Sequence, residues 1–135
     1  MDVVREPGSL CWLELYTTDV PGAAGFYNAT LGMETFAVDL FGGTYTTFAP
    51  GGEGADAMFG GVVDKADDPA EAHGPAYWLP YFEVTDTDAT VARAQELGGT
   101  VRVPATHLPD VGRVAKLADP YGARFAVIRS EPPQG

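Results

Sequence analysis

Hydrophobic and polar positions alternate near the start of the chain. Leu13 and Leu15 face one side of a strand predicted over residues 10–16, because successive strand side chains point to opposite faces. The other side carries three large or charged residues, Trp12, Glu14 and Tyr16. Two aromatics beside a carboxylate are typical of a pocket wall, and a packed interface or a second core layer is the alternative.

After this strand, the apolar residues recur with the period of an α-helix. Asp19 is a suitable N-cap, and Pro21 falls in the first turn, where a missing N–H costs nothing. The helix is expected to end at Gly32, a residue type common at helix ends. The apolar stripe of this helix consists of Ala23, Ala24, Phe26, Tyr27 and Leu31.

Three further strands are predicted over residues 33–40, 44–49 and 57–63. The last contains Gly60 and Gly61, where a ligand or another backbone can come close. The polar stretch that follows, residues 64–75, is expected to be a solvated linker with room for one helical turn.

The pattern then restarts. A strand over residues 76–84 precedes Asp86, which is expected to cap a second helix with a buried stripe of Ala89, Val91, Ala92, Ala94 and Leu97. The remaining elements are strands over residues 100–103, 113–118 and 123–129, with a loop over 104–112 and a tight turn over 119–122. Each half therefore reads strand, helix, three strands, and the two halves are expected to share a core.

A length of 135 residues fits a single domain. We expect module one at about residues 8–63, the linker at 64–75 and module two at about 76–129. The chain contains seventeen glycines and eleven prolines, and many of them lie between the patterned segments, which favours many short strands and turns.

The charge balance excludes some partners. The formal net charge is −11, and no basic patch is present to neutralise phosphates, so neither nucleic acid nor an anionic membrane is an expected partner. Cys11 is the only cysteine, so no intrachain disulfide is expected. The N-terminal stretch lacks the apolar core of a signal peptide, and a cytoplasmic location is the default expectation.

The two repeats resemble the vicinal oxygen chelate superfamily, which includes glyoxalase I, extradiol dioxygenases, fosfomycin-inactivating enzymes and bleomycin-resistance proteins. The resemblance covers about residues 8–129. It implies an α+β fold in which two βαβββ modules form a cupped, open mixed β-barrel with helices packed outside. In the first half it rests on Trp12-Leu13-Glu14-Leu15, Asp19, Phe26-Tyr27 and Leu31-Gly32-Met33. In the second half it rests on Tyr81-Phe82-Glu83-Val84, Asp86, Leu97-Gly98-Gly99 and Asp119-Pro120-Tyr121-Gly122.

Enzymes of this superfamily hold a divalent metal with His, Glu or Gln from four strand positions. The resemblance places these positions at Trp12, at Leu79, at Ala126 and within residues 57–62, and no ligand side chain occurs at any of them. We therefore expect no metal and no other cofactor. An off-pattern metal would need both histidines, His73 and His107, together with Glu14 or Glu83.

By the same resemblance, the faces that carry Glu14 and Glu83 line a cavity. Flat aromatic rings would stack on a planar ligand, and carboxylates would pair with an amine or accept ligand hydroxyls. For several of the expected aromatic residues, a place in the core or in a dimer interface is the alternative. The expected ligand-binding residues are Trp12, Glu14, Tyr16, Phe41, Tyr45, Phe48, Phe59, Trp78, Tyr81 and Glu83.

These expectations favour a metal-independent binding protein over an enzyme. Its ligand would be a planar aromatic or cationic natural product, and drug sequestration, as in antibiotic resistance, is the concrete form. The alternatives are a glyoxalase- or dioxygenase-like enzyme with an off-pattern metal, a metal-free isomerase or lyase with Glu14 or Glu83 as base, and a ligand-free interaction module. The resemblance also implies a homodimer.

Overall fold

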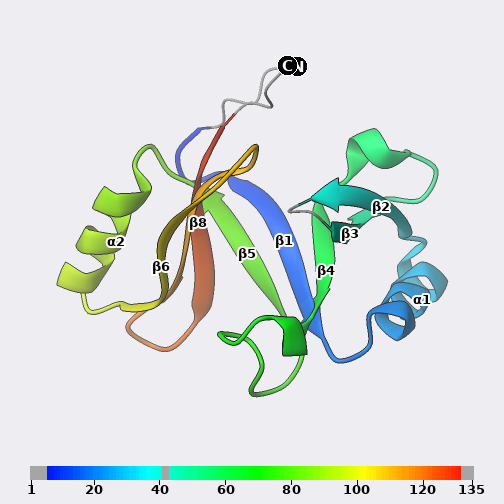
Figure 1. The fold of residues 1–135 in the computed structure, drawn as a ribbon, viewed down its shortest axis with the longest axis horizontal. Helices are drawn as coiled ribbons and strands as arrows, with labels where there is room; N and C mark the ends of the chain where they lie inside the picture. Colours follow the sequence, from blue (N-terminus) through cyan, green and yellow to red (C-terminus); the bar gives the residue numbers. More distant parts are fainter. Residues whose placement is uncertain (1–5, 41–42, 132–135) are drawn as a thin grey trace. The chain divides into compact units, whose positions relative to one another are not determined.

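The structure is a computed structural model that describes residues 6–40 and 43–131 (Figure 1). The chain divides into two compact units. Residues 12–78 form the first unit; residues from 79 onward, together with the N-terminal residues up to 11, form the second.

The first unit contains one helix and one set of neighbouring strands. Along the chain the elements are β1 (Leu10–Thr17), α1 (Val20–Leu31), β2 (Glu34–Leu40), β3 (Gly43–Ala49), η1 (Ala55–Ala57), β4 (Gly60–Asp64) and η2 (Lys65–Asp67). The strands neighbour one another in the order β2-β3-β4-β1. β2 pairs antiparallel with β3 and β3 with β4, whereas β4 runs parallel to β1.

The second half of the chain repeats this plan with β5 (Tyr77–Glu83), whose first two residues still belong to the first unit, α2 (Thr87–Glu96), β6 (Thr100–Leu108), β7 (Gly112–Ala118) and β8 (Arg124–Ser130). Its strand order is β5-β8-β7-β6, and the pair β5–β8 is again parallel. The N-terminal residues join β5, since the Glu83 N–H donates to the Ser9 carbonyl at 2.9 Å. The predicted α+β class and the repeated βαβββ plan are confirmed.

The first helix begins and ends where the sequence predicts. The Asp19 carboxylate accepts the Gly22 N–H at 2.9 Å, and Gly32 adopts a left-handed conformation with φ 72° at the C-terminal end. The buried face is narrower than the predicted stripe. Val20, Ala23 and Tyr27 pack against the core of Leu15, Phe48 and Val62. Phe26 is 60% exposed because it lies beside this line of contacts, and Leu31, in the last turn, is 62% exposed.

The second helix is likewise capped by an aspartate and buries only part of its predicted stripe. The Asp86 carboxylate accepts the Ala89 N–H at 3.0 Å. Val91 and Ala94 pack against the core of the second unit, which includes Ala115, Leu117 and Val127. Leu97 was expected in the buried stripe but is 61% exposed, because the helix already ends at this residue.

Two predicted boundaries shift. β6 continues through Leu108 into the predicted loop, and its pairing with β7 shifts register between Val103 and Thr106. This irregularity accommodates Pro104, which has no N–H to donate to a neighbouring strand. The fourth strand begins at Gly60, later than predicted, because a 3₁₀ turn occupies residues 55–57.

The segment between β4 and β5 differs most from its prediction. The expected helical turn is present as η2, Lys65–Asp67. The segment is not a fully solvated linker, however, since the Lys65 side chain is 3% exposed and Glu71 is completely buried. Within the described ranges, no helix is long and apolar enough to span a membrane.

Candidate functional site

The candidate site lies on the face of the first unit that points away from α1. Leu15 packs against the α1 side, so its neighbours Glu14 and Tyr16 project to the opposite face. Glu14 of β1 pairs with Gly61 of β4, and Gly61 pairs in turn with Thr47 of β3. Because side chains alternate along β3, this register also brings Tyr45 onto the face of Glu14.

The carboxylate of Glu14 is the centre of a hydrogen-bonded cluster. Its two oxygens each accept one phenol: Oε1 accepts the Tyr16 hydroxyl at 2.5 Å, and Oε2 accepts the Tyr45 hydroxyl at 2.5 Å. The Trp12 indole Nε1 donates to the Tyr45 oxygen at 3.1 Å, and these two rings lie 6.5 Å apart at an interplanar angle of 26°. We call Trp12, Glu14, Tyr16 and Tyr45 the Glu14 cluster.

Electrostatics keep the Tyr45 hydroxyl protonated. Burial raises the pKa of Tyr45 well above its usual range, and the charge of the Glu14 carboxylate and its hydrogen bond add to this effect. The hydrogen bond from Trp12 acts in the opposite direction and is the smallest contribution. Tyr45 is therefore a permanent donor to Glu14, and the carboxylate is an acceptor suited to cationic or hydroxylated groups.

Gly61 makes room for this arrangement. A Cβ atom built on Gly61 would lie 2.0 Å from the Tyr45 hydroxyl oxygen, so the phenol occupies the space that a side chain at position 61 would need. Gly61 pairs with Glu14 in the first unit as Ala126 pairs with Tyr81 in the second. The fourth metal-ligand position implied by the family resemblance, placed by sequence only within residues 57–62, thus corresponds to Gly61.

These residues do not fit the family's metal. Neither Gly61 nor Ala126 carries a ligand atom, and the Tyr45 phenol fills the space beside Gly61. In the part of the chain that the structure describes, no group of three or more His, Cys, Asp or Glu side chains is arranged to hold a metal ion.

The structure places three of the predicted aromatic residues on the α1 side of the first unit. Phe48 is completely buried in the core, and its ring stacks on Phe59 at 6.5 Å. Trp78 packs against the same core, and its indole N–H donates to the Tyr27 hydroxyl at 3.3 Å. They are not brought together with the Glu14 cluster and fit the core alternative. Phe41 lies outside the described residues.

Glu83, the second predicted carboxylate, is hydrogen-bonded within the second unit. Its side chain is 1% exposed and accepts hydrogen bonds from the Ser130 N–H at 3.0 Å and the Ser130 hydroxyl at 2.6 Å. The Cys11 thiol lies 3.3 Å from the same carboxylate, and Arg129 lies 3.9 Å away. Tyr81 lies on β5 opposite Ala126. A ligand role for Glu83 or Tyr81 stays a prediction.

Two residues beside the cluster were missed by sequence reasoning. The ring of Tyr77 stacks on Tyr16, with centroids 5.7 Å apart and an interplanar angle of 28°. The hydroxyl of Tyr77 donates to the carboxylate of Glu71. The alternation of β5 contained a signal for Tyr77, which shares the parity of Leu79, Tyr81 and Glu83. Glu71 had no such signal, because it is one of several acids in a polar stretch.

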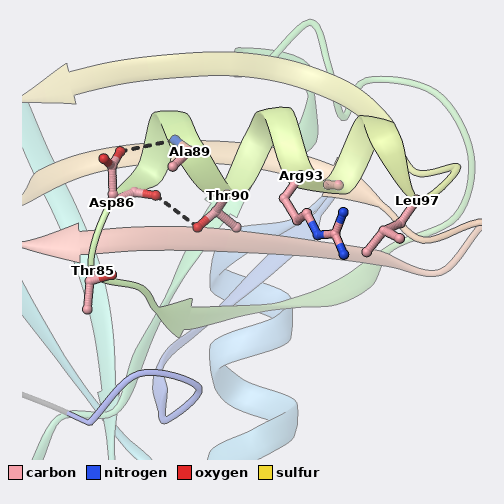
Figure 2. Close-up of a pocket in the computed structure, with 7 residues that line it drawn as sticks. Thr85, Asp86, Ala89, Thr90, Arg93 and Leu97 are labelled. Atoms are coloured by element: carbon pink, nitrogen blue, oxygen red, sulfur yellow. Dashed lines mark hydrogen bonds between the residues drawn. The ribbon is translucent and has the colours of Figure 1, made fainter.

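A separate groove of about 380 Å³ lies along one face of α2 (Figure 2). The polar groups at its start serve the helix itself: the Asp86 carboxylate caps the Ala89 N–H, and the Thr90 hydroxyl donates to the Asp86 carbonyl at 2.8 Å. We therefore place the candidate site at the Glu14 cluster. The groove is lined by Thr85, Asp86, Ala89, Thr90, Arg93, Ala94 and Leu97.

Two βαβββ modules, in each of which the last strand pairs in parallel with the first, define the fold class of the glyoxalases and their relatives. The chain belongs to the Glyoxalase/Bleomycin resistance protein/Dioxygenase superfamily, whose sequence profile matches residues 9–127.

Curated relatives are similar over nearly the whole chain. The protein named "Putative glyoxylase CFP32" from Mycobacterium tuberculosis is 37% identical over 133 residues, which cover 98% of this chain and 48% of that protein. "Anthracycline biosynthesis protein DnrV" from Streptomyces peucetius is 36% identical over 130 residues, covering 91% of this chain and 47% of that protein. The chain thus spans about half the length of these relatives.

A solved structure with the same fold is methylmalonyl-CoA epimerase from Streptomyces coelicolor. It has a TM-score of 0.66 and 16% sequence identity, and the match covers 96% of this chain and 99% of that one. At this level of identity the likeness shows the fold alone.

Proposed function

We propose that this chain binds a planar aromatic ligand that carries hydrogen-bond donors, without using a metal. The observation that carries the proposal is the Glu14 carboxylate, held by the phenols of Tyr16 and Tyr45 beside the flat ring of Trp12. Such a surface combines ring faces for stacking with an acceptor for an ammonium or hydroxyl group. In its narrower form, the proposal is that the protein sequesters a natural product of this kind.

Two further observations support this ligand class. Among the curated relatives are proteins named for the biosynthesis of anthracyclines, a class of polycyclic aromatic natural products. The net charge of −11 would also concentrate cationic ligands around the protein. The sequence-based expectation of a homodimer belongs to this proposal, and light scattering tests it.

A direct test is titration with a 1,4-dihydroxyanthraquinone that bears one ammonium side chain, followed by tryptophan fluorescence. The chain has two tryptophans, so Trp12→Phe leaves Trp78 as an internal reference. We expect saturable quenching that is largely lost in Trp12→Phe and weakened in Glu14→Gln. The analogue without the ammonium group should bind the wild type less tightly than the ammonium-bearing probe does. The two probes should bind Glu14→Gln with equal affinity. Absence of saturable quenching in the wild type would overturn the proposal.

A second candidate is an enzyme in which Glu14 acts as a general base. The observation in its favour is the same carboxylate, because glutamate side chains serve as general bases in many enzymes. Isomerisation of methylglyoxal–thiol adducts, with wild type and Glu14→Gln compared after purification without chelator, tests this alternative. Turnover that depends on Glu14, or on a stoichiometric divalent ion, would favour the enzyme.

A further inference from the structure

The segment between β4 and β5 is held in place by a buried lysine. The Lys65 side chain is 3% exposed, and its ammonium donates to two main-chain carbonyls, those of Glu71 and of His73, the latter at 3.3 Å. Burying an ammonium is costly unless it is hydrogen-bonded, and these carbonyls supply that compensation. Lys65 thereby fixes the backbone that carries Glu71.

Glu71 is completely buried and does not belong to the Glu14 cluster. Its carboxylate accepts the hydroxyl of Tyr77. A buried carboxylate needs hydrogen-bond donors, so the position of this phenol is coupled to that of Glu71. The backbone held by Lys65 therefore determines where the Tyr77 hydroxyl lies.

The coupling continues to the candidate site through ring contact. The Tyr77 ring stacks on Tyr16 at 5.7 Å, and the Tyr16 hydroxyl donates to Glu14 Oε1 at 2.5 Å. Tyr16 is itself 1% exposed, so its ring has little freedom to move independently of Tyr77. Two buried or partly buried carboxylates, Glu71 and Glu14, thus anchor opposite ends of a stacked tyrosine pair.

We propose that Glu71 and Tyr77 are positioning residues for the ligand site: they hold the Tyr16 ring in the orientation from which it donates to Glu14. This inference rests on the proposed function for its effect on binding, but its effect on Tyr16 is independent of any ligand. A preorganised acceptor binds more tightly because less ordering remains to be done on binding.

A network that only stabilises the fold would behave differently. Its loss would lower the melting temperature and leave the Tyr16–Glu14 hydrogen bond of the folded protein unchanged. A readout on Tyr16 itself therefore separates positioning from general stability.

The test uses three variants of the full chain. Tyr77→Phe keeps the stacked ring and removes the hydroxyl, and Glu71→Gln keeps the side-chain shape and removes the charge. Asp67→Asn is the matched control, since it removes an exposed carboxylate from the same segment. The ¹³Cζ resonance of Tyr16, assigned by comparison with Tyr16→Phe, reports its hydrogen bond to Glu14 in each free protein.

We expect the Tyr16 resonance to shift in Tyr77→Phe and in Glu71→Gln and to stay in place in Asp67→Asn. Affinity for the ammonium-bearing anthraquinone should fall about fivefold, the equivalent of one ordinary hydrogen bond. An unchanged Tyr16 resonance in folded Tyr77→Phe would overturn the inference, even if Glu71→Gln fails to fold. If the wild type does not bind the probe, the proposed function fails, and the Tyr16 resonance still decides whether the positioning role holds.

Discussion

Tyr45 and Gly61 face each other on neighbouring strands so closely that a Cβ atom on Gly61 would lie 2.0 Å from the Tyr45 hydroxyl oxygen. The same hydroxyl donates to Glu14. The absence of a side chain at position 61 therefore allows the phenol to reach the carboxylate. In this way one glycine shapes the acceptor on which the proposed function depends.

Replacing Gly61 with alanine should displace the Tyr45 hydroxyl and destabilise the fold by about 1–3 kcal/mol, the usual cost of overpacking. The double variant Gly61→Ala/Tyr45→Ala should be more stable than the sum of the two single effects predicts, because the collision is then removed. Urea unfolding of the four proteins measures this coupling. Gly60→Ala is the control: its Cβ would meet the Leu13 carbonyl oxygen at 2.0 Å, so Tyr45→Ala should not rescue it.

Removing only the Tyr45 hydroxyl should also destabilise the protein. Tyr45→Phe takes one donor from Glu14 and leaves the Trp12 indole without its acceptor, and an unsatisfied group of this kind costs about 1–3 kcal/mol. Denaturant unfolding should show this loss, and the emission of Trp12 should shift. Tyr121→Phe is the matched control, because that tyrosine is 94% exposed and should change neither quantity.

The raised pKa of Tyr45 predicts a specific loss of stability in alkali. The unfolded chain releases the proton of this phenol from about pH 10 upward, whereas the folded protein keeps it. The folded state then binds one proton more than the unfolded state, so stability falls by up to about 1.4 kcal/mol per pH unit above pH 10. Below pH 10 this contribution is fully retained.

Urea unfolding of wild type and Tyr45→Phe between pH 8 and about pH 11 checks this prediction. Other groups titrate in both proteins, so the difference between the two isolates Tyr45. The gap in stability should be constant up to about pH 10 and narrow above it. A gap that widens with pH would contradict the direction of the shift.

Glu83 should matter to the stability of the second unit. Glu83→Ala leaves the N–H and hydroxyl of Ser130 without their buried acceptor, and we expect a loss of about 2–3 kcal/mol. Ser130→Ala removes only the hydroxyl contact and should cost about 1 kcal/mol. Thermal unfolding compares them, with Glu96→Ala, whose side chain is 66% exposed, as the neutral control. Equal melting temperatures for Glu83→Ala and Glu96→Ala would show that the buried contacts of Glu83 contribute nothing.

Much of the fold could be predicted because its signals are local. Asp19 and Asp86 cap the two helices, and the period-two pattern around Leu15 places β1 and separates its two faces. Such signals depend on the spacing of residues within a few positions of one another, and the repeat of the whole pattern identifies two βαβββ modules. The side of β1 that carries Trp12, Glu14 and Tyr16 could likewise be chosen by alternation alone.

The sequence by itself thus determined the elements, their repeat and the acidic, aromatic face of the first strand. Only the tertiary structure decided that Tyr45 reaches Glu14. This contact depends on the register of β3 against β4 and on the space left by the missing side chain of Gly61. Likewise, only the tertiary structure decided that Phe48 belongs to the core and that Glu71 is buried and accepts the Tyr77 hydroxyl. Burial and register arise from packing between residues far apart in the chain, and no local pattern records them.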